Sequence, residues 1–421
     1  MKQILFFSLI LFTASSFAQG VRGFVLSHDN KPLTNATIYN LQTGAHEHSN
    51  ENGFFLLRDA RKGDSLRITH VSCSPLTILA GQDTLRIILQ PSAFQLENVT
   101  ITADVRHLNI ISDVDLQTNP VNSSQELLRK VPGLFIGQHA GGGKAEQIFL
   151  RGFDIDHGTD INISVDGMPV NMVSHAHGQG YADLHFLIPE TIGKIDFDKG
   201  PYYANKGNLA TAGYVAFETK DRLDHSLVQL EAGKFSSFRT LGMYNIVNNE
   251  KTPAWFAADY IKTDGFFDSP QNFNRLNLMG KYSAWLPGND KLSIAFSHFN
   301  SEWNASGQIP ERSVKDGSIG RFGAIDDTEG GNTSRSNLNL QFLKEVDENT
   351  FVKNTAYFSH YDFELYSNFT FFLNDPVNGD QIRQKEKRNI IGFQSELNRN
   401  FYWKKTVIDV QAAVGLRNDA I

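Results

Sequence analysis

From about Leu227 to the end of the chain, apolar and polar residues alternate in runs of about ten residues. Successive side chains of an extended strand point to opposite faces, so each run predicts a strand with one apolar and one polar face. The polar positions are mostly Asn, Gln, Lys, Asp and Ser. This pattern is typical of transmembrane β-strands, although a soluble β-sandwich also alternates. The clearest apolar faces are Leu276, Leu278, Tyr282, Ala284 and Leu286; Leu338, Leu340 and Phe342; and Ile408, Val410, Ala412 and Val414.

The connections between these runs are of two unequal kinds. Short connections lie at residues 248–253, 287–290 and 347–350, and long ones lie at 264–273, 301–335 and 362–387. Outer-membrane barrels have short turns at one end and long loops, which face outside, at the other. We therefore expect a membrane barrel rather than a soluble sandwich, with about nine strands between Leu227 and Leu416.

Upstream of these runs, glycine recurs wherever a short strand-like segment must turn sharply, because glycine has no Cβ atom to hinder the turn. The motifs are, in order, Glu126–Leu134, Leu150–Gly152, Ile161–Gly167, Ile195–Tyr203 and Ala212–Lys220. Together they resemble the plug domain of TonB-dependent outer-membrane receptors. The resemblance extends from about Glu126 to Lys220. We assign residues 105–222 to a plug domain and residues 225–421 to part of a barrel.

This resemblance implies a longer barrel than the chain supplies. Plugged transporter barrels have about 22 strands, and single-chain bacterial barrels have an even number. The chain ends at Asp419–Ile421 and not on the terminal aromatic strand that this family uses for assembly. We expect a truncated product or a fragment. The alternative is an eight-stranded barrel, whose own side chains would fill the interior and leave no room for a plug.

Residues 1–18 have the pattern of a secretory signal peptide, with Lys2 before a short apolar run and small residues before the expected cleavage. Residues 19–91 contain short strand-like runs separated by turn residues, which predicts a small β-sandwich. Cys73 is the only cysteine, so the chain has no internal disulfide and the thiol is expected to pack as a small apolar group.

The expected sandwich resembles the carboxypeptidase-regulatory-like domain that precedes many such receptors, through Lys31–Leu33, Ala36–Thr37 and Asn52–Phe54. The pair His46 and His48 could bind a metal, but we interpret it as exposed loop histidines. In all, we expect a mainly β protein with an N-terminal β-sandwich, an α/β plug domain and the first part of a transmembrane antiparallel β-barrel.

Residues 92–104 form a linker that contains a segment resembling the TonB box. A β-branched strand without a packed neighbour in its own domain is suited to pairing with a strand of another protein. The alternative is a last strand of the sandwich. The resemblance implies the TonB–ExbB–ExbD energy-coupling complex as partner. The candidate box consists of Leu96, Glu97, Asn98, Val99, Thr100, Ile101 and Thr102.

In the family that the chain resembles, the loop after the Asp166–Gly167 turn lies at the outward apex of the plug and contacts the ligand. Imidazole and carboxylate groups together suit zinc, copper, nickel or iron, so His175, His177 and His185 with Asp183 are candidate metal ligands. The alternative is that these histidines bind loop backbone or sugar-like hydroxyls. The full set of candidate substrate-binding residues is Asn171, His175, His177, Gln179, Tyr181, Asp183 and His185.

Two further predictions concern the plug. Arg151 stands at the family's Arg-Gly position, where the resemblance implies an inward arginine that pairs with barrel carboxylates and anchors the plug. His139–Glu146 superficially resembles a phosphate-binding loop, but Ala145 replaces the required Ser or Thr, and we expect a flexible plug loop.

These features favour an energy-coupled importer in the outer membrane of a Gram-negative bacterium, with its N-terminal domain in the periplasm. The preferred cargo is a metal ion or a siderophore-like metal chelate. The alternatives are an oligosaccharide or peptide importer that works with a surface lipoprotein, and a non-transporting adhesion or signalling protein. No catalytic motif indicates an enzyme, and a net charge of −7 without basic clusters argues against nucleic acid.

Overall fold

The computed structural model describes residues 20–28, 32–33, 35–50, 52–70, 73–81, 84–90, 110–112, 116, 120–121, 123–138, 142–288, 290–347, 349–403 and 406–421. The chain divides into two compact units, Met1–Ile101 and Thr102–Ile421. The predicted signal peptide and the predicted TonB box lie outside the described residues, so both stay predictions.

The N-terminal unit consists of two β-sheets that share one core. One sheet has the order β4-β1-β7 and the other the order β3-β2-β5-β6. Val25, Ile38, Leu66 and Leu89, which come from both sheets, are fully buried, and Cys73 joins the same core. This confirms the predicted β-sandwich. The strands are β1 (Val21–Ser27), β2 (Thr37–Asn40), β3 (His46–His48), β4 (Phe54–Leu57), β5 (Ser65–His70), β6 (Cys73–Leu79) and β7 (Leu85–Leu89).

We expected the histidine pair of this unit in a loop, but it lies on a strand. His46 and His48 lie on β3, where both are exposed. Strand β3 pairs with β2, with His46 opposite Tyr39 and His48 opposite Thr37.

The part of the second unit before the large sheet, residues 110–224, is called the plug region below. Its main sheet is mixed, in the order β13-β12-β15-β14-β8, and a smaller one has the order β11-β10-β9. Short 3-10 helices in this region are η3 (Gln125–Lys130), η4 (Pro189–Thr191) and η5 (Ala204–Lys206). The strands are β8 (Ile110–Ser112), β9 (Leu134–Gly137), β10 (Gln147–Leu150), β11 (Phe153–Asp154), β12 (Ile161–Val165), β13 (Met168–Pro169), β14 (Ile192–Lys199) and β15 (Gly213–Thr219).

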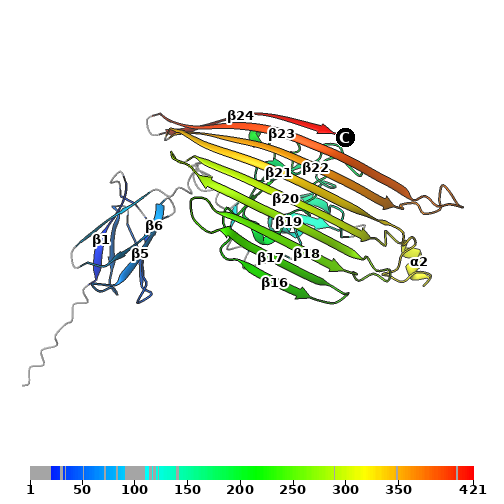
Figure 1. The fold of residues 1–421 in the computed structure, drawn as a ribbon, viewed down its shortest axis with the longest axis horizontal. Helices are drawn as coiled ribbons and strands as arrows, with labels where there is room; N and C mark the ends of the chain where they lie inside the picture. Colours follow the sequence, from blue (N-terminus) through cyan, green and yellow to red (C-terminus); the bar gives the residue numbers. More distant parts are fainter. Residues whose placement is uncertain are drawn as a thin grey trace, which may run out of the picture. The chain divides into compact units, whose positions relative to one another are not determined.

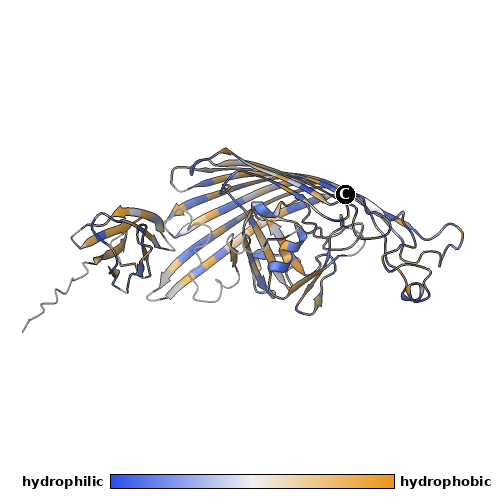
Figure 2. Ribbon diagram, turned by 90° about the horizontal axis from the view of Figure 1, so that it is seen from below, coloured by the Kyte–Doolittle hydropathy of each residue, from blue (hydrophilic) through white to orange (hydrophobic). Residues whose placement is uncertain are grey.

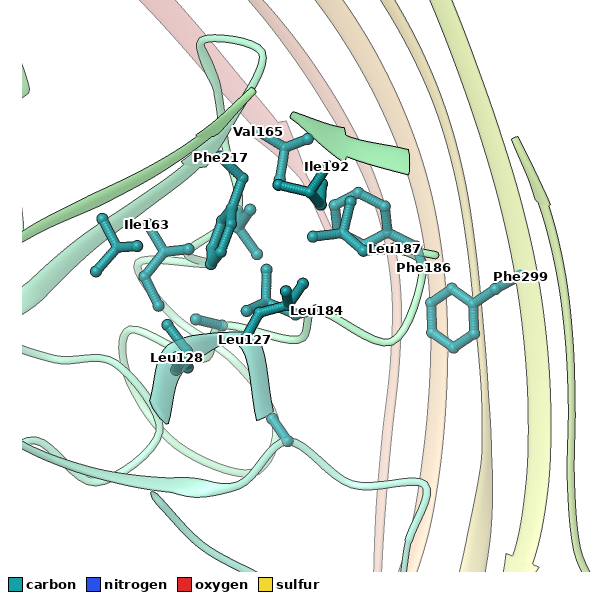
Figure 3. Packing of buried hydrophobic residues seen from close by; sticks show 14 of the residues in the cluster. Leu127, Leu128, Ile163, Val165, Leu184, Phe186, Leu187, Ile192, Phe217 and Phe299 are labelled. Carbon is teal, nitrogen blue, oxygen red and sulfur yellow. The ribbon is translucent and has the colours of Figure 1, made fainter. Parts of the chain in front are cut away.

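The core of the plug region continues into the large sheet. Figure 3 shows side chains of η3, β12 and β15 packed together, with Phe299 projecting from the large sheet toward Phe186. Leu128, Ile163 and Phe217 are fully buried, as is Phe299. Burial of each such side chain contributes about 1.5–3 kcal/mol, so the contact with the sheet is part of the stability of the plug region.

The large sheet contains nine antiparallel strands in sequence order, from β16 to β24 (Figure 1). Its two edge strands, β16 and β24, do not pair with each other. The number of strands agrees with the prediction. The strands are β16 (Leu227–Ala232), β17 (Phe238–Val247), β18 (Ala254–Thr263), β19 (Phe273–Trp285), β20 (Lys291–Asn304), β21 (Gly330–Asp347), β22 (Thr350–Ser367), β23 (Ile382–Trp403) and β24 (Thr406–Ala420).

The long loops are shorter than we predicted from the sequence. The connection that we placed at residues 301–335 is residues 305–329, and the one placed at 362–387 is residues 368–381. The strands extend into these polar segments because pairing continues there, for example between Glu302 and Asn332. Polar composition misled the prediction, since strand ends beyond an apolar belt are themselves polar. The loop of residues 305–329 also holds the short helix α2 (Glu311–Lys315).

The predicted alternation of faces is confirmed in the large sheet. Leu338 and Leu340 of β21 are 51% and 41% exposed on the outer face, whereas Asn337 before them and Asn339 between them are buried on the inner face. Hydrophobic and hydrophilic residues alternate along the strands in Figure 2. In the parts of the chain that the structure describes, no helix is long and apolar enough to cross a membrane.

Candidate functional site

The loop that we predicted to contact the ligand begins directly after a β-hairpin whose turn has two residues. Asp166 and Gly167 have φ angles of 45° and 75°, a left-handed pair that fits a tight turn between β12 and β13. The carboxylate of Asp166 accepts hydrogen bonds from the backbone N–H and the hydroxyl of Thr219 on β15, at 3.0 and 2.6 Å. The hairpin is thereby fixed, and it sets the start of residues 171–185, called the apex loop below.

Side chains of β23 hold the backbone of the apex loop. The amide of Gln384 donates to the carbonyl of Ala176, and Glu386 accepts from the N–H of Ala176, both at 2.9 Å. The guanidinium of Arg388 donates to the carbonyl of Ser174. Because Gln384, Glu386 and Arg388 alternate along the strand, all three point inward from one face. They are called the apex latch below.

Asn171, at the start of the apex loop, has a structural role. Its amide nitrogen donates to the carbonyl oxygens of Gly158, Ile161 and Gly180, and its side-chain oxygen accepts from the N–H of Ile163 at 2.7 Å. The side chain is 1% exposed. Both amide hydrogens and the side-chain oxygen bond to the backbone of the plug region, so this side chain supports the loop in this state.

His175 is part of an aromatic cluster against the inner wall of the sheet. Its ring stacks on Tyr181, with centroids 4.0 Å apart, and meets Phe363 of β22 edge-on at 4.7 Å. The backbone N–H of His177 donates to its Nδ1 at 3.2 Å, which leaves the proton on Nε2. Burial lowers the pKa of His175 to about 3, with further lowering by His177 and Arg388. The ring is therefore neutral at pH 7.

Asp183 and His185 lie beneath the loop in the core. One carboxylate oxygen of Asp183 accepts from both the backbone N–H and the Nδ1 of His185, each at 2.8 Å. Burial alone would raise the pKa of Asp183, but the contacts with His185 hold it below its ordinary value. Tyr181 is also buried, and its hydroxyl accepts from the N–H of Ala145 at 2.9 Å.

The structure therefore separates the seven predicted substrate-binding residues into two sets. Asn171, Tyr181, Asp183 and His185 are at most 3% exposed, whereas His175 and His177 are partly exposed and Gln179 is exposed. All seven were predicted as candidate ligand contacts, and in this structure only the second set has accessible surface.

The predicted metal ligands are separated in the same way. No group of three His, Cys, Asp or Glu side chains in the described residues is arranged to hold a metal ion. His185 and Asp183 bond to each other in the core, and His175 uses Nδ1 to bind the loop backbone. The four residues do not form a metal centre in this conformation.

One histidine near the apex loop was indicated only indirectly by the sequence. His157 is buried, and its ring lies 5.0 Å from the ring of His177. Its Nδ1 contacts the carbonyl of Glu146 at 3.2 Å, and its Nε2 lies 3.4 Å from Asp156. No local sequence pattern places His157 against His177.

The plug region is anchored by an arginine of the sheet and not by Arg151. Arg239 of β17 binds Glu190 of η4 through two parallel contacts of 2.8 and 2.9 Å, and its Nε donates to Asp259 at 2.8 Å. Arg151 is exposed at the turn between β10 and β11, with φ of 51°. Among the described residues it has no carboxylate partner, so the predicted anchoring role does not fit this geometry.

A second ionic contact holds the segment that leaves the plug region. Asp221 lies 2.5 Å from the Nζ of Lys291 and 3.2 Å from that of Lys281. Burial would raise the pKa of Asp221, but the two ammonium groups lower it well below its ordinary value. Lys281 also lies 3.6 Å from Asp166, which links this contact to the hairpin that precedes the apex loop.

The described part of the loop that we predicted to be flexible is packed. Residues 139–141 lie outside the described residues, but Lys144 and Ala145 are both 1% exposed. A Cβ atom at Gly143 would lie only 2.0 Å from the ring of Trp303, so only glycine fits there. Burial lowers the pKa of Lys144 to about 8.

Residues 100–214 match the protein family described as the TonB-dependent Receptor Plug Domain. These residues are a TonB-dependent receptor plug. The nine-stranded sheet that surrounds one side of the plug has the same fold as part of the solved structures described next. The plug match assigns the chain to the outer membrane of a Gram-negative bacterium.

Solved structures with the same fold are receptors and transporters. The open form of the ferric-catecholate import receptor Fiu from E. coli K12 is 18% identical, with a TM-score of 0.56, over 74% of this chain and 48% of that one. The unliganded ferric citrate transporter FecA is 13% identical, with a TM-score of 0.61, over 74% and 47%. The copper transporter OprC is 18% identical, with a TM-score of 0.52, over 74% and 45%. The chain thus spans about half the length of the structures that it matches.

Proposed function

We propose that the chain is the plug and the first barrel section of a TonB-coupled importer for a metal chelate. The observation that carries the proposal is the position of the apex loop. It is fastened to β23 within a few residues of the long loop 368–381, whereas Asp221 is bound beside the short turn 286–290, by Ser283 and Lys291. A ligand that enters from the long-loop end meets the apex loop first.

The contacts of the apex loop suit a ligand-controlled release. The apex latch binds the loop mainly through backbone N–H and C=O groups, which a polar ligand can engage in its place. His175, His177 and Gln179 are the predicted contact residues with accessible surface. Release of the loop would also loosen the hairpin at Asp166. The backbone carbonyl of Asp166 accepts hydrogen bonds from the side chains of Asn339 and Gln341 on β21.

A chelate fits this loop better than a bare ion. The described residues offer no group of three metal-binding side chains, so the loop cannot replace the ligand shell of a free ion. Hydrogen-bonding and aromatic groups recognise instead the organic shell of a chelate. The matched structures include a ferric-catecholate receptor and a ferric citrate transporter, which agrees with this cargo class.

Energy coupling completes the proposal. The segment Leu96–Thr102 is the TonB box in the periplasm, and the TonB–ExbB–ExbD complex pulls on it after ligand binding. The N-terminal sandwich lies in the same compartment, ahead of the box.

The test is binding and uptake of iron-55 as a ferric tris-catecholate and as ferric citrate, in cells whose outer membranes contain the chain. We expect saturable binding of one of them, reduced at least tenfold in the double variant His175→Ala with His177→Ala. The matched control replaces His298 and His360, which lie on the outer face of the sheet, and should bind normally. Equal binding by all variants, or none by the wild-type chain, would overturn the chelate proposal.

Deletion of residues 96–102 separates import from adhesion. An importer without its box still binds the labelled chelate but does not accumulate it inside the cell. An adhesion or signalling protein has no need of the box, so unchanged function after the deletion would reject energy coupling.

A further inference from the structure

The outer face of the large sheet changes from apolar to polar along one sharp line. Hydrogen-bonded register places Phe296, Leu338, Phe358 and Ile391 side by side on β20 to β23. These four residues are 40–60% exposed. The next outward positions toward the long loops are His298, Ser336, His360 and Asn389, again side by side. The line therefore marks the edge of an apolar belt that faces lipid.

Beyond this edge, toward the long loops, three cationic side chains lie on a single strand, β23. Arg383, Lys385 and Lys387 occupy alternate positions of β23, and their side chains are 54%, 60% and 69% exposed. Alternate residues of a strand are about 7 Å apart, so the three charges form a row about 14 Å long. This row is called the basic ladder below. Toward the belt, the same face of β23 continues with Ile391, Phe393 and Leu397, which are all exposed.

The carboxylates beside the ladder only partly neutralise it. Glu364 of β22 contacts Arg383 at 2.7 Å and Lys385 at 3.0 Å, and Asp362 lies 3.8 Å from Lys387. Two carboxylates thus face three cations. Exposed ion pairs of this kind are weak, and each ammonium group has further donors directed to the surroundings. The ladder remains able to bind an additional anion.

We propose that the basic ladder binds the phosphate headgroup of an anionic lipid of the outer leaflet, with the acyl chains on Ile391, Phe393 and Leu397. The geometry combines charge complementarity with an adjoining apolar surface, which is what an amphiphile with a phosphorylated headgroup requires. The ladder lies on the opposite face of β23 from the apex latch, so it does not serve the ligand that the plug receives. A row of this length matches a headgroup that bears more than one phosphate.

The test uses the purified full chain in dodecyl maltoside micelles, and native mass spectrometry detects bound lipid. The probes are bisphosphorylated lipid A, its monophosphorylated form and zwitterionic phosphatidylcholine. We expect binding in that order, and at least a fivefold weaker retention of lipid A in 0.5 M NaCl, because salt screens exposed charges. Equal retention of lipid A and phosphatidylcholine would overturn the proposal. Competition by inorganic phosphate alone would show that the ladder takes a soluble anion, which also overturns it.

A charge-matched pair of variants locates the site. The triple variant Arg383→Gln, Lys385→Gln and Lys387→Gln should retain at least tenfold less lipid A than the wild-type chain. The control changes Lys251, Lys344 and Arg399 to Gln, which removes the same charge from exposed positions toward the short-turn end. Equal loss in both triple variants would mean that net charge, not the ladder, governs binding, and the proposal would fail.

A measurement on the unaltered chain keeps the proposal testable if the triple variant does not fold. A lipid A analogue with a photoreactive group beside its phosphate is activated in outer membranes, and the cross-linked peptides are identified by mass spectrometry. The proposal requires cross-links within residues 383–389. Cross-links confined to other strands would reject it.

Discussion

The plug region is attached to the sheet in two different ways, at its apex and at its base. At the apex, the latch on β23 contacts backbone groups of residues 174–176, and an aromatic cluster packs around His175. The second attachment, called the base below, consists of ionic contacts in which charged side chains of the sheet, Arg239, Lys281 and Lys291, hold Glu190 and Asp221. Hydrogen bonds between a side chain and a backbone carbonyl can be exchanged for contacts with a ligand. A buried ion pair cannot be broken without leaving an uncompensated charge.

This difference means that the apex can open while the base stays closed. The net contribution of an ordinary hydrogen bond is about 1 kcal/mol, whereas breaking a buried pair costs about 3–5 kcal/mol. Opening of the apex alone is therefore a low-energy local event of the kind that ligand-binding loops undergo. The predictions below test the two attachments against each other.

The largest effect is expected at the base. Arg239→Met leaves Glu190 and Asp259 without their shared partner, so we expect a loss of about 3–5 kcal/mol in the free energy of unfolding. Urea unfolding of the plug–sheet unit, followed by tryptophan fluorescence, measures it, since Trp255 donates to the carbonyl of Lys220 at the base. The double variant Arg239→Met with Glu190→Gln should recover part of the loss. A loss below 1 kcal/mol in the single variant would show that the base is not held by this pair.

A smaller and local effect is expected at the apex. Gln384→Ala removes two hydrogen bonds of the apex latch, one to the carbonyl of Ala176 and one to the ring of His177, each contributing about 1 kcal/mol. We expect at least tenfold faster hydrogen exchange at the amide of Ala176, with unchanged exchange at the base. The control Asn389→Ala alters the outer face of the same strand, where Asn389 bonds to His360. If exchange at the base rose equally, apex and base would open together and the comparison would fail.

The smallest effect is a pH dependence that belongs to the apex. Burial lowers the pKa of His175 from 6.5 to about 3, so the docked loop favours the neutral ring. A depressed histidine pKa stabilises the docked state above pH 6.5, and this stabilisation is lost as the pH falls from 6.5 toward 3. The slope is at most about 1.4 kcal/mol per pH unit. Hydrogen exchange of the apex loop between pH 7 and pH 4 measures the loss.

His175→Phe provides the matched control for this pH dependence. It keeps an aromatic ring against Tyr181 and Phe363 but has no titratable group. In this variant, the pH dependence of amide hydrogen exchange in the apex loop should be only the intrinsic one, without the extra loss of protection at low pH. An unchanged acid sensitivity in this variant would assign the effect to another group.

Periodic features were predictable from the sequence, and long-range partners were not. The alternation at Leu338 and Leu340 needs only a local rule, and the nine strands follow from it. The hairpin at Asp166–Gly167 was equally local. By contrast, Arg239 finds Glu190 through the packing of two separate elements, and no local pattern indicates that pair.

The burial of part of the predicted site could not be foreseen for the same reason. Polar residues that cluster in a loop suggest a binding surface, but Asn171 and Asp183 are buried because they satisfy backbone groups, those of β12 and its neighbours for Asn171 and that of His185 for Asp183. Only the fold distinguishes a polar side chain that supports the loop from one that it presents. His157 shows the reverse case, since its contact with His177 joins segments that no motif connects.

Strand β23 carries two unrelated surfaces in alternate positions of one short segment. Gln384, Glu386 and Arg388 face the plug, and Arg383, Lys385 and Lys387 face away from it. A single-residue insertion or deletion near Ile382 would exchange the two sets, because side-chain direction has a period of two residues. Unpaired ammonium groups would then meet the apex loop, and the apex latch would face the membrane. We therefore expect this segment to accept substitutions one at a time but to reject any change in its length, which a deletion scan of residues 382–389 would reveal.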